Sequence, residues 1–319
     1  MSSARILLLG ASGFIGRSIT REFVDECYGG ELLLHVHRRR PAEGLADEFA
    51  VHQLDLRVAD LGAYAHVLDA TRPDVVINCA GLTSGSDADL HAVNVDVVTK
   101  LIATLSGRRG VHLVQIGSAA EYGPQRSGVP VAETSLAAPK SPYGISKYEA
   151  TRRLMDSVAA GRIDVTILRI FNPLGRYSSS ATLAGSASLL MRDAIRDGAD
   201  CIRLGSLSSW RDYIDIRDVA RAALAAARER HEGGVILNVG RGEAVQSRQL
   251  IASLADVAGF TGSIIETAEG SQRSNVVPWQ CADVAAIRDE LGWTPRYTIR
   301  DSLRELWDET QHDVPAMSR

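Results

Sequence analysis

The stretch A-R-I-L-L-L-G-A-S-G-F-I-G, residues 4–16, decides the fold of this chain. An apolar run ends at Gly10, and Gly13 and Gly16 then lead into residues 17–26, which are predicted to form a helix. A strand, a glycine turn and a helix in this order form the context that a dinucleotide site requires. The glycines permit a tight turn and a close approach of a pyrophosphate, and the helix N-terminus attracts that anion. We therefore predict a dinucleotide-binding fold of the α/β class.

Apolar runs and helical segments alternate through the first half of the chain. The predicted strands are residues 31–37, 51–56, 74–81, 111–118 and 164–172, and helices are expected near residues 90–105 and 143–160. The unbroken apolar run within residues 74–81 is typical of a parallel strand that is buried on both faces. This order predicts a Rossmann-type doubly wound parallel sheet.

The regular alternation of predicted strands and helices ends after residue 172. We therefore divide the chain into a dinucleotide-binding domain, residues 1–172, and a smaller, mainly substrate-binding C-terminal domain, residues 173–319. The second part contains a predicted apolar helix near residues 184–197. A helix and a strand within about residues 217–240 are expected to return to the main sheet, so that the two domains interleave.

Composition favours small-molecule chemistry. The 319 residues carry a formal net charge of −4 with a pI near 6.1, so no basic balance suggests nucleic acid or a membrane as a partner. Cys27, Cys79, Cys201 and Cys281 lack the close spacing of a zinc site and are too few for a disulfide scaffold, so we expect reduced thiols and no metal. We find neither a signal-like leader nor a membrane-spanning stretch, and the cytoplasm is the predicted location.

The segment after the second predicted strand bears on the cofactor. An Asp or Glu at this place normally holds the ribose 2′-hydroxyl of NAD, whereas residues 37–41 read His-Arg-Arg-Arg-Pro. Guanidinium groups bind phosphate through charge-assisted, often bidentate hydrogen bonds. The sequence therefore favours NADP(H), with NAD(H) as the second option. The alternative is a solvated basic turn, and which arginine would contact the 2′-phosphate cannot be read.

The G-x-x-G-x-x-G spacing of residues 10–16 resembles that of short-chain dehydrogenases/reductases of the extended type. The resemblance implies that residues 55–56 contact the adenine and that residues 79–81 form a small-residue segment beside the cofactor ribose, with Cys79 a packing residue rather than a redox thiol. The predicted cofactor-binding residues are Gly10, Ser12, Gly13, Phe14, Ile15, Gly16, His37, Arg38, Arg39, Asp55, Leu56, Cys79, Ala80, Gly81, Tyr143 and Lys147.

Tyr143 and Lys147 lie four residues apart at the predicted start of a helix, so they share one face. A tyrosine has a reference pKa of about 10, and a fixed cation beside it stabilises the phenolate and lowers that pKa, which suits a general acid or base. Such a pair alone is more often a helix start with a packed tyrosine. Ser118, however, closes a predicted strand at the edge where ligands bind. Together the three resemble the catalytic Ser, Tyr and Lys of the extended enzymes.

Residues 210–220, W-R-D-Y-I-D-I-R-D-V-A, resemble a late segment that marks family members acting on nucleotide sugars. The resemblance assigns Arg211 to the substrate diphosphate and Arg273 to a second contact. Thr83, Glu121 and Asn172 complete the predicted substrate-binding residues. A structural contact is the alternative role for Glu121.

Three activities compete in this family: dehydration, epimerisation and reduction of a keto-sugar. Dehydratases carry an acid immediately after the catalytic hydroxyl residue, whereas Ala119 and Ala120 stand here and cannot move a proton. The basic segment of residues 37–41 favours a reductase, which consumes NADPH, over an epimerase, which keeps NAD(P) tightly bound. Residues 117–123 and 169–175 resemble reductases of nucleotide-linked 4-keto-6-deoxy sugars, such as GDP-4-keto-6-deoxymannose reductase. Residues 279–283 differ from these reductases, so the nucleotide base of the substrate is not identified. A non-catalytic cofactor sensor is disfavoured, because such relatives typically lose the Tyr–Lys pair.

Assembly is predicted from the resemblance. Relatives commonly dimerise by pairing the helices here expected at residues 90–105 and 143–160 into a four-helix bundle. Leu101, Ile102 and Leu105 suit a helix–helix seam, but they could equally face the sheet. We expect a homodimer.

Overall fold

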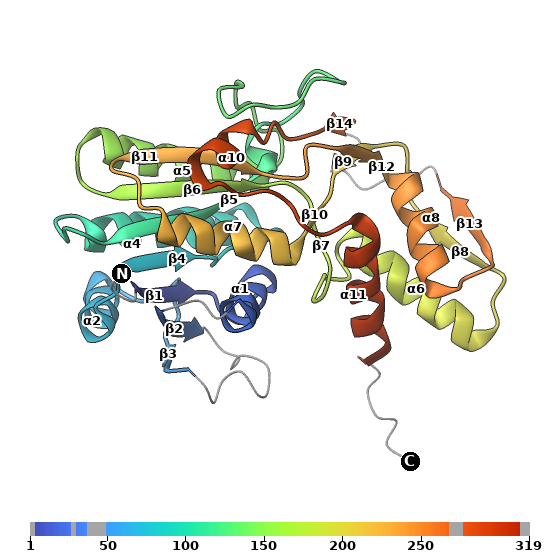
Figure 1. Ribbon diagram of the computed structural model, residues 1–319, viewed down its shortest axis with the longest axis horizontal. Coiled ribbons are helices and arrows are strands. Elements are labelled where there is room, and N and C mark those ends of the chain that lie inside the picture. Colours follow the sequence, from blue (N-terminus) through green and yellow to red (C-terminus); the bar gives the residue numbers. More distant parts are fainter. Residues whose placement is uncertain (1–3, 27–29, 37–48, 268–276, 313–319) are drawn as a thin grey trace, which may run out of the picture.

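A computed structural model of the chain describes residues 4–26, 30–36, 49–267 and 277–312. Its main feature is a seven-stranded sheet in the order β11-β6-β5-β4-β1-β2-β3, in which every neighbouring pair is parallel (Figure 1). The strands are β1 (Ala4–Leu9), β2 (Gly30–Val36), β3 (Val51–Gln53), β4 (Val75–Asn78), β5 (His112–Ser118), β6 (Asp164–Ile170) and β11 (Gly234–Val239). The predicted Rossmann-type sheet is confirmed, although β3 ends three residues earlier than expected.

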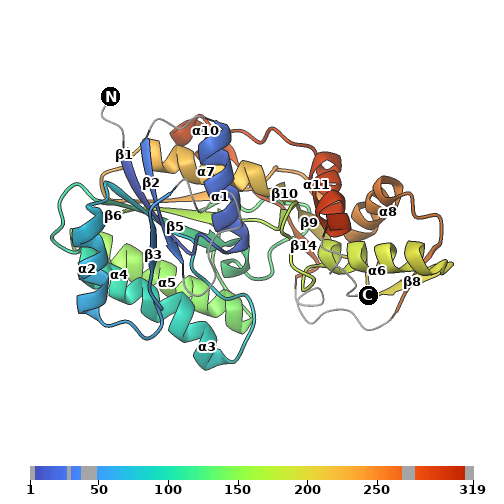
Figure 2. The same ribbon diagram turned by 90° about the horizontal axis from the view of Figure 1, so that it is seen from below.

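Helices cover both faces of this sheet, as Figure 2 shows. One face is covered by α1 (Phe14–Asp25), α7 (Ile216–Arg228) and α10 (Ala285–Leu291), and the other by α2 (Leu61–Thr71), α4 (Val97–Leu105) and α5 (Pro142–Ala159). Successive side chains of β1 alternate between the two cores, with Ile6 and Leu8 on the α1 side and Leu7 and Leu9 on the α4 side. Because both faces are buried, the strand reads as an unbroken apolar run.

The predicted helix at residues 90–105 is interrupted. It comprises α3 (Asp87–His91), a π-helical turn (Ala92–Asp96) and α4, and such a turn inserts one extra residue into the helix. Leu101 and Leu105 are 1% and 2% exposed and lie in the core under the sheet. They therefore face the sheet rather than a helix–helix seam.

The second half of the chain builds its own core. It consists of β7 (Pro173–Leu174), α6 (Leu183–Asp197), β8 (Cys201–Leu204), β9 (Trp210–Asp212), β10 (Ile214–Asp215), β12 (Ala244–Gln246), α8 (Ser247–Ala258), β13 (Ser263–Glu266), β14 (Trp279–Gln280) and α11 (Ile299–His312). The apolar faces of α6, α8 and α11 pack together in this core (Figure 1). Between these elements the chain runs back to the large sheet in α7 and β11.

A second return to the large sheet, in α10, was not anticipated from the sequence. Ile287 and Trp293 lie in the core beside α7, and the Trp293 indole N–H donates to the Asp218 carbonyl at 3.2 Å. The segment is too short for its apolar spacing to show which sheet it covers. Within the described ranges no helix is both long and apolar enough to cross a membrane.

Candidate active site

The glycine turn after β1 forms a closely packed cradle. Gly10 has φ +79°, and a Cβ there would lie 2.9 Å from the backbone nitrogen of Ala80. A Cβ on Gly16 would lie 2.3 Å from the Gly10 carbonyl oxygen. Gly13 is the N-cap of α1 and has no side chain that could cap the backbone N–H groups of the first turn of that helix. These N–H groups therefore remain available to an anion. The predicted residues 10–16 and 79–81 thus come together, as the predicted site for a cofactor pyrophosphate and ribose requires.

The remaining predicted cofactor contacts are less completely described. His37, Arg38 and Arg39 lie outside the described residues. Asp55 lies after β3 and forms an ion pair with Arg57 at 3.5 Å. The neighbouring Leu56 is 7% exposed and packs in the core.

Ser118, Tyr143 and Lys147 are brought together by β5 and α5. Ser118 is the last residue of β5, and its hydroxyl oxygen accepts from the Ala120 N–H at 3.2 Å. Tyr143 is half-buried in the first turn of α5. Lys147, one turn later and 6% exposed, donates through Nζ to the carbonyl of Ile116 on β5 at 2.5 Å. The ammonium group therefore lies at the strand that ends in Ser118.

Helix α5 begins where the sequence places it. Ser141 is its N-cap, and the serine hydroxyl accepts from the Gly144 N–H at 3.0 Å, while Pro142 occupies the first helical position. This cap fixes the turn that carries Tyr143.

Burial sets the ionisation of Cys79 and Lys147, which lie beside Gly81. It lowers the pKa of the Lys147 ammonium, and the charge of Glu121 opposes that shift. It raises the pKa of the Cys79 thiol to about 12, against a smaller lowering by Lys147. Cys79 therefore stays protonated at neutral pH, as expected of a packing residue rather than a redox thiol.

Glu121 was included among the substrate contacts, but its side chain is fully buried. Its Oε1 accepts from the Ser118 N–H at 2.8 Å, and its Oε2 accepts from Thr151 and Arg169, each at 2.9 Å. Both oxygens are therefore occupied by protein donors. The structure places Glu121 behind the site as a structural contact, which was the alternative reading.

Asn172 and Arg211, two further predicted substrate residues, lie where the two halves of the chain meet. Asn172 follows β6, and its side-chain amide donates to the Asp212 carbonyl at 2.9 Å. Arg211 is half-buried on β9 and donates to the Trp210 carbonyl at 2.8 Å, and burial lowers the pKa of its guanidinium. Thr83 lies exposed in the loop after β4, and Arg273 lies outside the described residues.

Sequence reasoning missed two polar residues at this site. Asn94, in the π-helical turn, exchanges hydrogen bonds of 2.9 Å with both backbone groups of Leu82 and donates to Ser146. An Asn flanked by valines in an apolar helix was the available signal. Gln280 on β14 donates to the Ala119 carbonyl at 2.9 Å and so joins the C-terminal half to the turn after Ser118. No local pattern indicated that contact.

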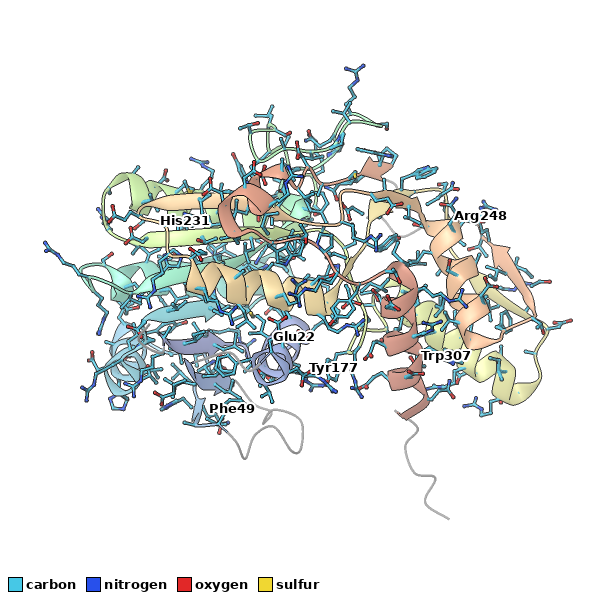
Figure 3. All side chains as sticks on the ribbon, in the orientation of Figure 1. Glu22, Phe49, Tyr177, His231, Arg248 and Trp307 are labelled. Carbon is cyan, nitrogen blue, oxygen red and sulfur yellow. The ribbon has the colours of Figure 1, made fainter. Side chains whose placement is uncertain are left out.

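A cavity of about 330 Å³ lies apart from the catalytic residues, between α1, α7 and α11. Glu22 and Tyr177, labelled in Figure 3, belong to its lining. Burial, followed by the charges of Glu26 and Asp25, raises the pKa of Glu22 to about 7. None of the predicted site residues lines this cavity.

The known proteins to which this chain is similar are enzymes of nucleotide sugars. The family model described as NAD dependent epimerase/dehydratase family matches residues 6–240. Among curated proteins, dTDP-6-deoxy-L-talose 4-dehydrogenase (NAD(P)(+)) of Kitasatospora kifunensis is 34% identical over 308 residues, which cover 95% of each chain. UDP-glucose 4-epimerase of Rhizobium leguminosarum bv. trifolii is 26% identical, and GDP-6-deoxy-D-mannose reductase of Pseudomonas aeruginosa is 27% identical, each covering 97% of this chain and 98% of the relative.

Solved structures show the same fold. The structure of RMD from Pseudomonas aeruginosa complexed with NADPH superposes with a TM-score of 0.82 at 24% identity and covers 98% of this chain and 99% of that one.

Proposed function

The chain belongs to the NAD-dependent epimerase/dehydratase family, and within it we propose that the protein uses NADPH to reduce the C4 ketone of a nucleotide-linked 4-keto-6-deoxy sugar. The observation that supports this proposal is that Lys147 donates to Ile116 on β5, the strand that ends in Ser118, and lies 4.0 Å from where a Cβ on Gly81 would stand, with Tyr143 one turn earlier on α5. The relative at 34% identity supports the sugar class, because a 4-dehydrogenase of a 6-deoxy sugar run in reverse is a 4-ketoreductase. We propose a dTDP-linked or a GDP-linked substrate.

Each residue of the proposed site has a separate role in the reduction of the ketone. The bound cofactor supplies a hydride. Tyr143 donates the proton that the reduced carbonyl oxygen requires, and the Ser118 hydroxyl donates a hydrogen bond to that oxygen. Lys147 holds the cofactor ribose and stabilises the phenolate that forms on Tyr143. Arg211 and Arg273 bind the diphosphate, and Thr83 and Asn172 line the sugar site.

An epimerase with resident NAD(P) is the second candidate, and the 26% identical UDP-glucose 4-epimerase favours it. The purified protein separates the two. We expect it to purify without stoichiometric cofactor and to oxidise added NADPH only when given a 4-keto-6-deoxy sugar linked to dTDP or GDP, with UDP- and CDP-linked sugars as comparisons. Bound cofactor together with interconversion of two sugars without added reductant would establish the epimerase instead.

Cofactor preference is predicted from charge at one segment. We propose that Arg38 or Arg39 binds the 2′-phosphate of NADPH. One arginine–phosphate pair contributes on the order of 1.5–3 kcal/mol, which corresponds to a roughly ten- to hundredfold higher affinity for NADPH than for NADH. Replacing both by Ala should weaken NADPH binding more than NADH binding in fluorescence titrations, and added salt should reduce the preference. Equal affinity for both cofactors in the unaltered protein would show that the segment is only a solvated turn.

A homodimer built from α4 and α5 is our proposal for the assembly. Since Leu101 and Leu105 are buried within one chain, the seam must use other residues of these helices, such as the half-buried Ile102. We predict a light-scattering mass of about twice 34.3 kDa at micromolar concentration. A mass near the monomer value would contradict this assembly.

A further inference from the structure

One buried carboxylate joins three parts of the catalytic site. Glu121 accepts from the backbone N–H of Ser118 at the end of β5, from the hydroxyl of Thr151 on α5, and from the guanidinium of Arg169 on β6. Thr151 lies one turn after Lys147, so the two share a face of α5. The side chains of Glu121 and Arg169 are 0% and 4% exposed. The carboxylate thus connects the strand that carries the serine to the helix that carries the lysine.

Two glycines make room for this connection. A Cβ on Gly117 would lie 2.8 Å from Oε1 of Glu121, and a Cβ on Gly144 would lie 2.5 Å from the carbonyl oxygen of Ala120. The first glycine precedes the catalytic serine, and the second follows the catalytic tyrosine. Contacts this close hold the turn after β5 and the first turn of α5 in one relative position.

The charge of Glu121 also acts on Lys147. Burial lowers the pKa of the Lys147 ammonium, and Glu121 and then Cys79 are the groups that raise it. The Cys79 thiol on the β4 side has its pKa raised by burial to about 12, so it carries no charge at neutral pH. Glu121 is therefore the carboxylate that offsets the desolvation of the lysine among the described groups.

The remaining charged and titratable groups face Glu121 from other sides. Arg169 on β6 is paired with it and stacks 4.5 Å from the centre of the Tyr122 ring. Burial raises the pKa of Tyr122 to about 12, and Glu133 adds to that shift, so Tyr122 stays neutral at physiological pH. Tyr143 lies one turn before Lys147 on α5.

We propose that Glu121 is a positioning residue for the reaction: its carboxylate fixes Ser118 against the Tyr143–Lys147 helix and supplies negative charge to the buried surroundings of Lys147. The inference deepens the proposed function, because turnover is one of its two readouts. The second readout, the titration of Lys147, requires no substrate. Failure of the role proposed for Glu121 can therefore be told apart from failure of the proposed reductase function.

The first experiment observes Lys147 itself. Lys100, Lys140 and Lys147 are the lysines of the whole sequence, so ¹³C-labelled lysine gives a simple NMR spectrum. In Tyr143→Phe protein, where the lysine titrates without a coupled phenol, we expect Glu121→Gln to lower the Lys147 ionisation midpoint by roughly one pH unit. Glu149→Gln is the matched control: this carboxylate lies on α5 but is 37% exposed and pairs with Arg153, so the midpoint should not move.

The second experiment isolates position from charge. Thr151→Val keeps the shape and the carboxylate but removes the hydrogen bond between Glu121 and α5. We expect kcat to fall about three- to tenfold with KM and NADPH affinity nearly unchanged, and the alkaline limb of the pH profile to stay in place. In Glu121→Gln the same limb should move to lower pH.

An unpaired buried Arg169 could prevent Glu121→Gln from folding. The double variant Glu121→Gln with Arg169→Gln removes both charges of the Arg169–Glu121 ion pair, and Arg169 is not among the groups that act on Lys147, so the lysine midpoint should still fall. An unchanged Lys147 midpoint in the folded Glu121 variant, or unchanged kcat in Thr151→Val, would overturn the proposal.

Discussion

Replacing Tyr143 with Phe is expected to lower kcat by roughly 10³-fold, because the substitution removes the hydroxyl that delivers the proton while keeping the ring. The fold should be unaffected, since the N-cap at Ser141 and the bond from Lys147 to the Ile116 carbonyl do not involve that hydroxyl. NADPH affinity should therefore remain nearly constant. Steady-state oxidation of NADPH with the best 4-keto sugar measures the first effect, and fluorescence titration measures the second.

Tyr148→Phe provides the matched control, because Tyr148 is also half-buried on α5 but lies outside the predicted site. Its turnover should equal that of the unaltered protein. Turnover of the Tyr143→Phe protein within tenfold of the unaltered protein would show that another group donates the proton.

Replacing Asp212 with Ala is expected to destabilise the C-terminal half of the site more than any other single change that we propose there. Asp212 is fully buried on β9, and its carboxylate accepts from the backbone N–H groups of Arg241, Gly242 and Ala282 at 2.8, 2.9 and 3.0 Å. An alanine leaves all three donors without these acceptors; the Ala282 N–H is buried, while the other two bonds are only partly buried. At about 1–3 kcal/mol for each unsatisfied group the loss would reach about 9 kcal/mol if all three were buried; because water can reach the two partly buried donors, we expect the free energy of unfolding to fall by roughly 3–6 kcal/mol.

The loss should appear as a fall in Tm of roughly 10 °C and as a lower midpoint in chemical denaturation. The neighbouring Arg211 would lose its fixed position on β9, so KM for the nucleotide sugar should rise as well. Asp212→Asn, which keeps the size and one acceptor oxygen, should lose less stability. A loss below about 1 kcal/mol in the alanine variant would mean that the three donors find water or other partners.

The fold could be predicted from the sequence because its central strands are buried on both faces. Burial of both faces makes β1 and β4 short apolar runs, and the glycine turn of residues 10–16 marks the end of β1. Ser118, Tyr143 and Lys147 could be proposed together as a candidate site because Ser118 stands at the carboxyl end of a strand, Tyr143 in the first turn of a helix and Lys147 one turn later. These features are local in the sequence.

The features that were missed depend on contacts between distant residues. Arg169 is 48 residues from Glu121, and nothing near either residue indicates that they pair. Helical spacing places Leu101 and Leu105 on one face of α4 but does not tell whether that face meets the sheet or a second subunit. The return of α10 to the large sheet likewise depends on a partner, α7, that is far away in the chain.

The most direct test of net ketone reduction follows the hydride. With NADPH that carries deuterium at the transferred position of the nicotinamide, we predict a sugar product with deuterium at C4, in an amount equal to the NADPH oxidised. Mass spectrometry and proton NMR of the product measure both the amount and the position. A sugar product without deuterium, formed while NADPH is not consumed, would contradict the proposed reductase and identify an epimerase that recycles its own cofactor.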